Sequence, residues 1–501
     1  MKTKKQHWTT ILVVAAIASL ASGCAPEANG NAASDEPMAA DAPMQKWVST
    51  MTLSSDCGVV NKLRMPGAPG GMGMGMGGAR EPRAPVETDL ERVQPGYVVL
   101  EPTGEKETFL LGVDKEIAGS YFGDYYPKYT QLLPNGHRLY SSKATTMAIH
   151  NGGGSTTGCV EEYDANGDLV WRISLNNDYI LSHHAVRKMP NGNVLAQVWQ
   201  KSSGEIAVAQ GRDPETLPED GDFWFDAIIE IDPMAMEIVW EWNVRNHLIQ
   251  EFDPTKANYG VVADHPELMD INQFDIEDGE IHPDWIHSNA IDYHPELDQI
   301  VVSFRSLHEI LIIDHSTTSR EAEGHSGGRY GKGGDFLYRW GNPQIYGRGT
   351  AEDQKSFNQH DVQWIRDGLP GAGNLLIFNN GNPDLRPYTT IVEISPERNP
   401  DGSYVLEDGK PYGPEEMVWE YNPPEEERFF ASYISGVQRM PNGNTFINAG
   451  ALGFQREVTP SGDTVWEYEY RNEYGAPDAM FRAEKHPPDY PGLKGLISPD
   501  E

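Results

Sequence analysis

The chain has 501 residues, a formal net charge of −36, 51 glycines and 36 prolines. Because acidic residues are spread along the whole chain, nucleic acid is excluded as the expected partner and a soluble, self-repelling surface is predicted. Helical periodicity is scarce, and aromatic and β-branched runs between turn residues indicate an all-β protein.

The first 24 residues are predicted to be a bacterial lipoprotein signal peptide. Three lysines lie among the first five residues, a broadly apolar stretch covers residues 8–20, and small residues precede Cys24. An ordinary signal peptide or a short membrane helix is the alternative, but the apolar run is short for a span. We therefore expect an exported protein, on the periplasmic side of a bacterial membrane or at the cell surface, with a lipid anchor on Cys24.

Residues 25–91 are predicted to be a low-complexity tether, because alanine, proline, glycine and acidic residues dominate them. Met72, Met74 and Met76 could bind Cu(I) through their thioethers, although a flexible linker explains them more simply. A strand at 44–53 is expected to dock on the following domain.

Two further cysteines, Cys57 and Cys159, remain if Cys24 carries lipid. An exported chain with two cysteines can pair them, and two free thiols are the alternative.

Residues 92–472 repeat a unit of four short strands. Pro-Asn-Gly turns recur at 134–136, 190–192 and 441–443, and Val-Trp-Glu-Trp/Tyr segments recur at 239–242, 418–421 and 465–468. Such self-similar units predict a six-bladed β-propeller. The predicted blades are 92–123, 124–176, 177–245, 280–345, 355–424 and 428–472.

The predicted blades are longer than common propeller repeats because of inserts at 201–226, 246–279, 318–335 and 397–416. Inserts on one face of a propeller usually form the walls of a binding site. The sixth unit is incomplete by itself, so we expect 92–123 to close the ring with the C-terminal blade. Residues 473–501 are expected to be an extension that packs on the propeller.

Three histidines are the first candidate site residues. His184, His287 and His360 fall within about one residue of a common position, where each innermost strand begins. The repeat should therefore aim three imidazoles into one end of the central channel. Histidine titrates near neutral pH and can act as a nucleophile, a base or a metal ligand.

Two arginines accompany these histidines. Arg305 follows an innermost strand in VVSFRS, and Arg386 lies in FNNGNPDLRP, after the strand that contains His360. A guanidinium group suits bidentate capture of a tetrahedral oxyanion, whereas the alternative is a surface salt bridge. Together with Asn289 and Asn358, these side chains predict a pocket for a sulfate- or phosphate-like group.

These segments resemble the bacterial arylsulfotransferases. The resemblance rests on WIHSNAIDY–IVVSFR, NQHDVQWI–GNLLIFNNGN–R, VQRMPNGNTFINAG and the tail FRAEKHPPDYPGL, and it spans about 92–493. It implies a six-bladed propeller outside the cytoplasm that moves a sulfuryl group between phenols through a sulfohistidine, without a nucleotide donor. His287, His360 and Arg386 match the positions that hold the sulfate oxygens.

The resemblance has one important departure. In the family the nucleophilic histidine lies in the last blade, in the segment aligned to 448–455, where this chain has no histidine and Leu452 stands near the expected place. His486 lies in the tail, too far along the chain to substitute easily. Either His360 or His184 then attacks, with His287 as a further catalytic candidate, or the family chemistry is lost.

The predicted function is transfer of a sulfuryl group from an aryl sulfate to a phenolic acceptor. The alternatives are an aryl sulfatase that uses water, and an inactive propeller that binds a sulfated or anionic aryl ligand. No cofactor is expected, because no phosphate-cradling glycine loop is present. No metal is expected either: the calcium-like spacing at 164–168 lacks its distal glutamate, and no ligands converge near His282.

Overall fold

The computed structural model describes residues 51–58, 79–80, 85–144, 156–273 and 281–497. All of them belong to one compact unit, Lys46–Glu501. The predicted signal peptide with Cys24, most of the predicted tether and the methionine triplet lie outside the described residues. Within the described residues, no helix is long and apolar enough to cross a membrane.

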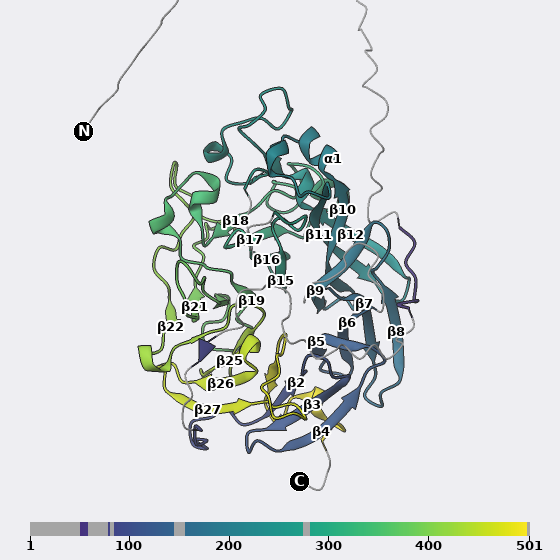
Figure 1. The fold of residues 1–501 in the computed structure, drawn as a ribbon, viewed down its shortest axis with the longest axis vertical. Helices are drawn as coiled ribbons and strands as arrows, with labels where there is room; N and C mark the ends of the chain where they lie inside the picture. The colour runs from purple at the N-terminus through teal and green to yellow at the C-terminus, as the bar shows by residue number, and fades with distance from the viewer. Residues whose placement is uncertain (1–50, 59–78, 81–84, 145–155, 274–280, 498–501) are drawn as a thin grey trace, which may run out of the picture. The chain divides into compact units, whose positions relative to one another are not determined.

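Six four-stranded antiparallel sheets are arranged around a centre, which confirms the six-bladed β-propeller (Figure 1). Strands β5, β9, β15 and β19 lie near that centre, while β4, β8, β22 and β27 lie at the periphery. The second sheet contains β5 (Tyr126–Leu132), β6 (Arg138–Lys143), β7 (Gly158–Tyr163) and β8 (Leu169–Ser174). The third contains β9 (Ile180–Lys188), β10 (Val194–Ser203), β11 (Asp222–Asp232) and β12 (Glu237–Asn243).

The next three sheets follow in chain order. The fourth contains β15 (Ser288–His294), β16 (Gln299–Phe304), β17 (Glu309–Asp314) and β18 (Tyr338–Trp340). The fifth contains β19 (His360–Trp364), β20 (Leu375–Asn379), β21 (Thr390–Ile394) and β22 (Trp419–Tyr421). The sixth contains β24 (Gly436–Arg439), β25 (Thr445–Ala449), β26 (Phe454–Val458) and β27 (Thr464–Glu469).

The first sheet closes the ring in a way that differs from the expectation. The unit at 428–472 has four strands of its own, so it is complete. The incomplete unit is 92–123, which supplies only β2 (Tyr97–Leu100), β3 (Glu107–Gly112) and β4 (Ile117–Phe122). Its fourth strand is β28 (Glu484–His486), which pairs antiparallel with β2. Backbone hydrogen bonds between the two ends of the chain therefore close the propeller.

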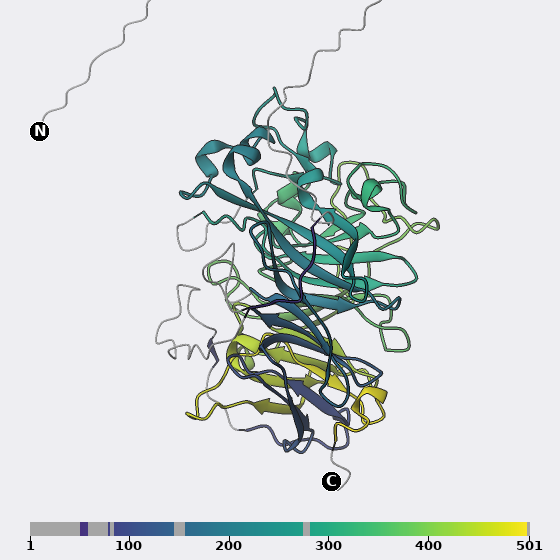
Figure 2. The same ribbon diagram turned by 90° about the vertical axis from the view of Figure 1, so that its right-hand side faces the viewer.

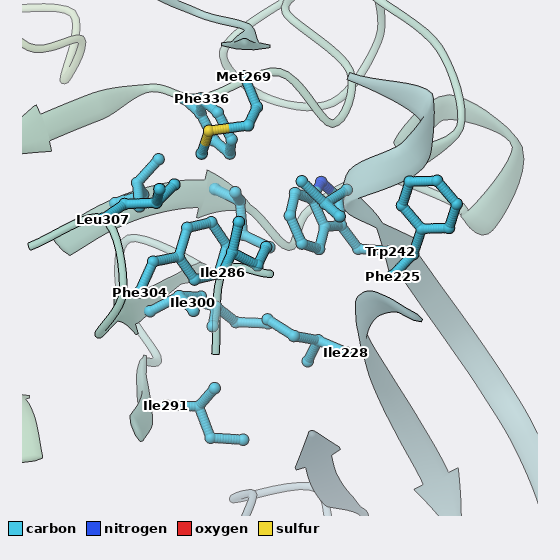
Figure 3. Packing of buried hydrophobic residues seen from close by; sticks show 14 of the residues in the cluster. Phe225, Ile228, Trp242, Met269, Ile286, Ile291, Ile300, Phe304, Leu307 and Phe336 are labelled. Atoms are coloured by element: carbon cyan, nitrogen blue, oxygen red, sulfur yellow. The ribbon is translucent and has the colours of Figure 1, made fainter. Parts of the chain in front are cut away.

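An apolar core fills each of the six spaces between neighbouring sheets. Side chains alternate between the two faces of a strand, so every second residue packs against one neighbouring sheet and the others pack against the sheet on the opposite side. In β11, for example, Ile228 packs toward the fourth sheet, and Ile229 and Ile231 pack toward the second. Figure 3 shows the core between the third and fourth sheets, with Trp242, Phe304 and Phe336.

The inserts contain the few helices of the described chain. Figures 1 and 2 both place the teal insert with α1 (Gly204–Ala209) at the top of the view. The predicted insert at 201–226 is shorter than expected, because β10 runs to Ser203 and β11 begins at Asp222. The same insert contains the 3-10 turn η2 (Pro214–Thr216). Other connections contain α2 (Ser319–Ala322) and the 3-10 turns η3 (Val244–Asn246), η4 (Val262–Asp264), η5 (Pro343–Tyr346) and η6 (Ala351–Asp353).

Three more 3-10 turns and two small ribbons complete the described elements. The turns are η7 (Glu425–Glu427), η8 (Gly450–Leu452) and η9 (Pro491–Leu493). The ribbons pair β1 (Ala79–Arg80) with β23 (Phe429–Phe430), and β13 (Leu248–Ile249) with β14 (Met269–Asp270).

A disulfide bond joins Cys57 to Cys159 in β7, which resolves the open alternative in favour of pairing. The same N-terminal segment docks on the second sheet, since Ser174 donates its backbone N–H to the carbonyl of Ser54 at 2.6 Å. Leu53 is buried in the core beside it. Only residues 51–53 of the predicted strand at 44–53 are described, and they are not a strand.

Candidate active site

The innermost strands present one side chain each at a shared position. This position lies six residues before the residue that opens the following turn. The side chains there, in chain order, are Lys128, His184, Asn289, His360, Ser435 and Phe481. His184 and His360 are therefore equivalent, as expected, whereas His287 lies two residues before the equivalent Asn289. The sequence analysis did not select Lys128, which holds the equivalent position in the second sheet; burial lowers the pKa of its amine to about 8.

His360 begins β19 and is buried. Its Nδ1 lies 3.0 Å from the carbonyl oxygen of Asn358 and 2.8 Å from Oδ1 of Asn380. The Asn380 amide is fixed because its Nδ2 donates to the carbonyl of Ala431 at 2.7 Å. Both partners of Nδ1 are acceptors, so Nδ1 carries the proton and Nε2 keeps its lone pair. Nε2 makes no hydrogen bond within the described chain.

The electrostatics keep His360 neutral. Burial, followed by the nearby charge of Arg305, lowers the pKa of His360 well below its ordinary value. A neutral imidazole with a free Nε2 can act as a nucleophile without first losing a proton. His360 therefore has the tautomer and the charge that attack on an electrophile requires.

His184 lies on β9 in a pair with its neighbour. Its Nδ1 is 2.8 Å from Nδ1 of His183, so one of the two nitrogens donates to the other. His183 stacks on Trp199 with ring centroids 4.0 Å apart. Burial lowers the pKa of His183 to about 3, and burial and the neighbouring histidines lower that of His184 well below its ordinary value. Nε2 of His184 is buried without a hydrogen-bond partner among the described residues.

His287 meets His184 face to edge, with ring centroids 4.7 Å apart. Nδ1 of His287 lies 2.5 Å from Oδ2 of Asp284, so this carboxylate accepts its proton. Nε2 is then the nitrogen that can take up and release a proton. The pair of His287 and Asp284 has the arrangement of an acid–base group oriented by a carboxylate.

A second carboxyl lies behind this pair. Asp226 is buried, and its pKa is raised well above the ordinary value by burial and by the charge of Asp284. Its Oδ1 accepts the backbone N–H of Ser288 at 3.1 Å and lies 3.6 Å from Nε2 of His183. Burial and the neighbouring carboxylate therefore both favour the neutral form of Asp226.

The backbone beside the histidines is strained. His184, His287 and Asn358 have φ values of 52°, 50° and 49°, in the left-handed region that favours glycine. Such conformations cost on the order of 1–3 kcal/mol each and persist when the surrounding structure enforces them. Strain of this kind gathers at functional sites, and here it recurs in three successive blades.

Arg482 is a buried cation that the sequence analysis did not select. Its Nε lies 3.2 Å from Oδ1 of Asp361, yet none of its three guanidinium nitrogens makes a hydrogen bond within the described chain. Its positive charge is one of the causes that lower the pKa of His184. A guanidinium group with unused donors beside neutral imidazoles is suited to hold an oxyanion. A sequence signal for Arg482 did exist. The preceding residue, Phe481, occupies the position in the C-terminal segment that is equivalent to His184 and His360.

The two predicted arginines differ in their surroundings. Arg305 is buried, and its charge acts directly on His360. Arg386 donates from Nη1 to Thr390 Oγ1 at 2.7 Å and from Nη2 to the carbonyl of Asn379 at 3.0 Å. These contacts fix the strand that leads to Asn380, the amide that orients His360. Burial lowers the pKa of Arg386 to about 10.

The two predicted asparagines frame His360. Asn289 donates from Nδ2 to the carbonyl of Gln359 at 2.8 Å. Asn358 donates its backbone N–H to Nδ1 of His308 at 3.0 Å and accepts from His360. The Oδ1 atoms of both asparagines are buried without a hydrogen-bond partner among the described residues.

The last blade offers no imidazole to the site. Leu452 ends η8 and packs, partly buried, against the core between the fifth and sixth sheets. His486 lies in β28, where its ring stacks on Tyr490 with centroids 4.3 Å apart. A cavity of about 120 Å³ near the sixth sheet is lined by Asp361, Arg439 and Glu484, but by none of the three candidate histidines.

These features define a class of protein, a six-bladed propeller with a candidate anion site of imidazole and guanidinium groups. The sequence model of the arylsulfotransferase (ASST) family matches residues 130–489, more than half of the chain. The chain therefore belongs to the arylsulfotransferase family. No curated protein matches it significantly in sequence.

Solved structures resemble the chain only distantly. A protein of unknown function from Bacteroides caccae is 11% identical, with a TM-score of 0.40, over 78% of this chain and 98% of that protein. Virginiamycin B lyase from Staphylococcus aureus is 10% identical, with a TM-score of 0.32, over 77% of this chain and 87% of that chain. At these TM-scores, the likenesses carry no argument about activity.

Proposed function

We propose that the protein transfers a sulfuryl group from an aryl sulfate ester to a phenolic acceptor, without a nucleotide donor, and that His360 is the nucleophile. Family membership supports the reaction class. The observation that carries the role of His360 is its fixed tautomer, with Nδ1 bonded to two acceptors and a neutral Nε2 left free.

The proposed reaction has two steps. The lone pair of His360 Nε2 attacks sulfur, the S–O bond to the aryl group breaks, and the departing phenolate takes a proton from Nε2 of His287. His287 then removes the proton of the acceptor phenol. The acceptor oxygen attacks sulfur, the S–N bond breaks, and His360 is restored. Asp284 keeps His287 in one orientation through both steps.

Cations and donors around His360 would stabilise the sulfuryl oxygens, where negative charge gathers in the transition state. Arg305 and Arg482 are the buried guanidinium groups whose charges act on the histidines. Nδ2 of Asn358 is a further donor without a hydrogen-bond partner in the described chain. In this proposal Arg386 and Asn289 act mainly by positioning the strands on both sides of His360.

Aromatic side chains next to the histidines suit an aryl ester. Phe481 lies 5.8 Å from the ring of His184, and Trp199 lies 6.3 Å from the ring of His287. Offset or edge-to-face contacts with a phenyl ring would add affinity beyond the area buried. The second candidate function is binding alone, because Leu452 occupies the last-blade segment in which the resemblance places a histidine nucleophile.

The proposed setting is outside the cytoplasm, with a lipid on Cys24 as the membrane anchor. The disulfide between Cys57 and Cys159 supports this setting, because disulfides persist in oxidising compartments. A small-molecule donor and a phenolic acceptor are the proposed partners, and the net charge of −36 speaks against nucleic acid.

The test uses the full chain and an aryl sulfate that releases a coloured phenol, with and without a second phenol. We expect release that depends on the acceptor, together with an adduct of about 80 Da, the mass of one sulfuryl group, that maps to His360. Release of free sulfate without an acceptor would instead indicate a sulfatase. No release, combined with a raised unfolding temperature in the presence of the ester, would indicate a protein that only binds.

A further inference from the structure

We infer that His247, His325 and Asp335 form a zinc site that joins two inserts of the propeller. His247 follows η3 after the third sheet, whereas His325 and Asp335 lie in the loop between α2 and β18 of the fourth sheet. Nδ1 of His247 is 2.8 Å from Oδ1 of Asp335, and Nδ1 of His325 is 2.7 Å from the same oxygen. All three candidate ligand atoms lie within 4.8 Å of one another.

The orientation of the His247 ring suits a metal ion at this place. Its Nε2 lies 2.9 Å from the carbonyl oxygen of Ala322, so Nε2 carries a proton and donates it there. The other ring nitrogen, Nδ1, is turned toward the carboxylate of Asp335. Metal-bound histidines characteristically donate their second N–H to a carbonyl or carboxylate in this way.

Two imidazoles converge on one carboxylate oxygen, which brings three groups of the kinds that bind zinc to one place. With bonds of about 2.0–2.1 Å, neighbouring ligand atoms of tetrahedral zinc lie about 3.3 Å apart. The two N–O distances are shorter than this by about half an ångström, a separation that small side-chain shifts can supply. Two imidazoles and one carboxylate favour zinc over magnesium or calcium, which prefer oxygen ligands.

Solvent can supply the fourth ligand. The side chain of His325 is 61% exposed, while that of His247 is fully buried. The site therefore has one face toward water and one toward the protein. Three protein ligands with one open position are a common zinc arrangement.

The protein frame around His247 is rigid. Trp242 lies parallel to its ring, with centroids 5.6 Å apart, and donates from Nε1 to the carbonyl of Gly334 at 2.7 Å. Trp242 and Phe336 belong to the core in Figure 3. Position 334 must be glycine, since a Cβ there would lie 2.6 Å from Nε2 of His247. A bound zinc ion would thus link a buried ring to a glycine-rich loop and stabilise that loop.

The test uses the untagged full chain, stripped of metal with a chelator, and titration calorimetry with zinc chloride. We expect one zinc ion per chain and a higher unfolding temperature. His325→Ala should weaken zinc binding at least about tenfold. It should also abolish the thermal shift without altering the fold, because His325 is exposed. The matched control is His265→Ala, which changes an exposed histidine of the same insert as His247 that pairs with Glu267 and should leave zinc binding unchanged.

Cobalt gives an independent readout. The wild-type chain should develop the visible absorption of tetrahedral Co²⁺, and the His325→Ala chain should not. Equal zinc affinity in these two proteins, or no zinc binding by the wild-type chain, would overturn the inference and leave the three residues as a hydrogen-bonded group. Because the experiment does not measure sulfuryl transfer, its outcome is independent of the proposed function.

Discussion

Blades five and six use the same backbone position for different purposes. In blade five that position is His360, whose Nδ1 is fixed by two acceptors so that Nε2 is left free. In blade six it is Ser435, whose Oγ accepts the backbone N–H of Gly450 at 3.0 Å and so holds η8. The comparison shows that one blade leaves a buried imidazole nitrogen without a hydrogen bond, whereas the next uses its polar atom to hold a turn.

Leu452 is a second residue of blade six that has a structural role. It ends η8, the turn that Ser435 holds, and it packs against a core rather than presenting a nucleophile. Under the proposed function, the nucleophile has moved from the last blade to the blade before it. Such a move is compatible with a propeller, because equivalent positions of different blades face the same axis.

His360→Ala should have the largest effect. It removes the proposed nucleophile, so acceptor-dependent phenol release should fall at least about 1,000-fold and the adduct should disappear from the mass spectrum. Ser435→Ala is the matched variant at the equivalent position and should retain transfer and adduct within about tenfold. If the serine variant were the inactive one, the assignment of roles to the two blades would be reversed.

His287→Ala should reduce transfer by about 100-fold with donors whose phenol is a poor leaving group. The loss should be much smaller with a strongly acidic phenol, since that leaving group needs no proton. Steady-state rates for two such donors give the measurement. An equal loss for both donors would contradict the assignment of His287 as the general acid.

Arg482→Gln should weaken binding of the aryl sulfate by about 10- to 100-fold, because it removes a charged donor at a buried anion site. Arg386→Gln is the comparison, and we expect it to be milder, since Arg386 already bonds to Thr390 and Asn379. Titration calorimetry with an unreactive aryl sulfonate measures both. A larger loss of affinity with Arg386→Gln would contradict this assignment and would show that Arg386, the arginine favoured by the sequence resemblance, is the main anion-binding residue.

The pH dependence should be weak. Burial lowers the pKa of His360, so its imidazole stays neutral at every pH above the ordinary histidine value of about 6.5 and becomes protonated only well below it. Adduct formation from a donor with an acidic phenol should therefore change by less than about threefold between pH 6.5 and 8. Rapid-quench mass spectrometry gives the rate, and a steep rise with pH across this range would contradict a neutral His360.

Leu452→His should have the smallest effect. If His360 is the nucleophile, a new imidazole in the last blade should raise transfer by no more than about threefold and should not carry the adduct. Peptide mapping of the trapped protein checks this. A large gain of activity with an adduct on the new histidine would show that the natural chain is a binding propeller that lacks its nucleophile.

Local patterns predicted most of the fold. The turn motifs and the Val-Trp-Glu segments marked strands of the second, third, fifth and sixth blades, because these signals lie within each unit. The closing strand β28 was missed since its partner β2 is distant in sequence, and no pattern within three residues reveals a long-range pair. For the same reason the unit at 428–472 was wrongly expected to be incomplete.

The candidate site residues divide in the same way. His184 and His360 could be found by counting from the turns, whereas Asp284 and Arg482 act through contacts between distant segments. The metal ligands were invisible in the sequence, since His247 and His325 lie in different inserts and meet only in the folded chain. Counting from the turn at Pro487 would have drawn attention to Phe481 and its neighbour Arg482.

The position of Arg482, two residues before β28, has a consequence for biosynthesis. A ribosome makes this residue and the closing strand after every other blade, so a nascent chain has an open ring without that cation. Premature termination anywhere upstream of Arg482 would remove the cation and the ring closure together. Under the proposed function, completion of the polypeptide, closure of the propeller ring and assembly of the proposed anion site therefore coincide.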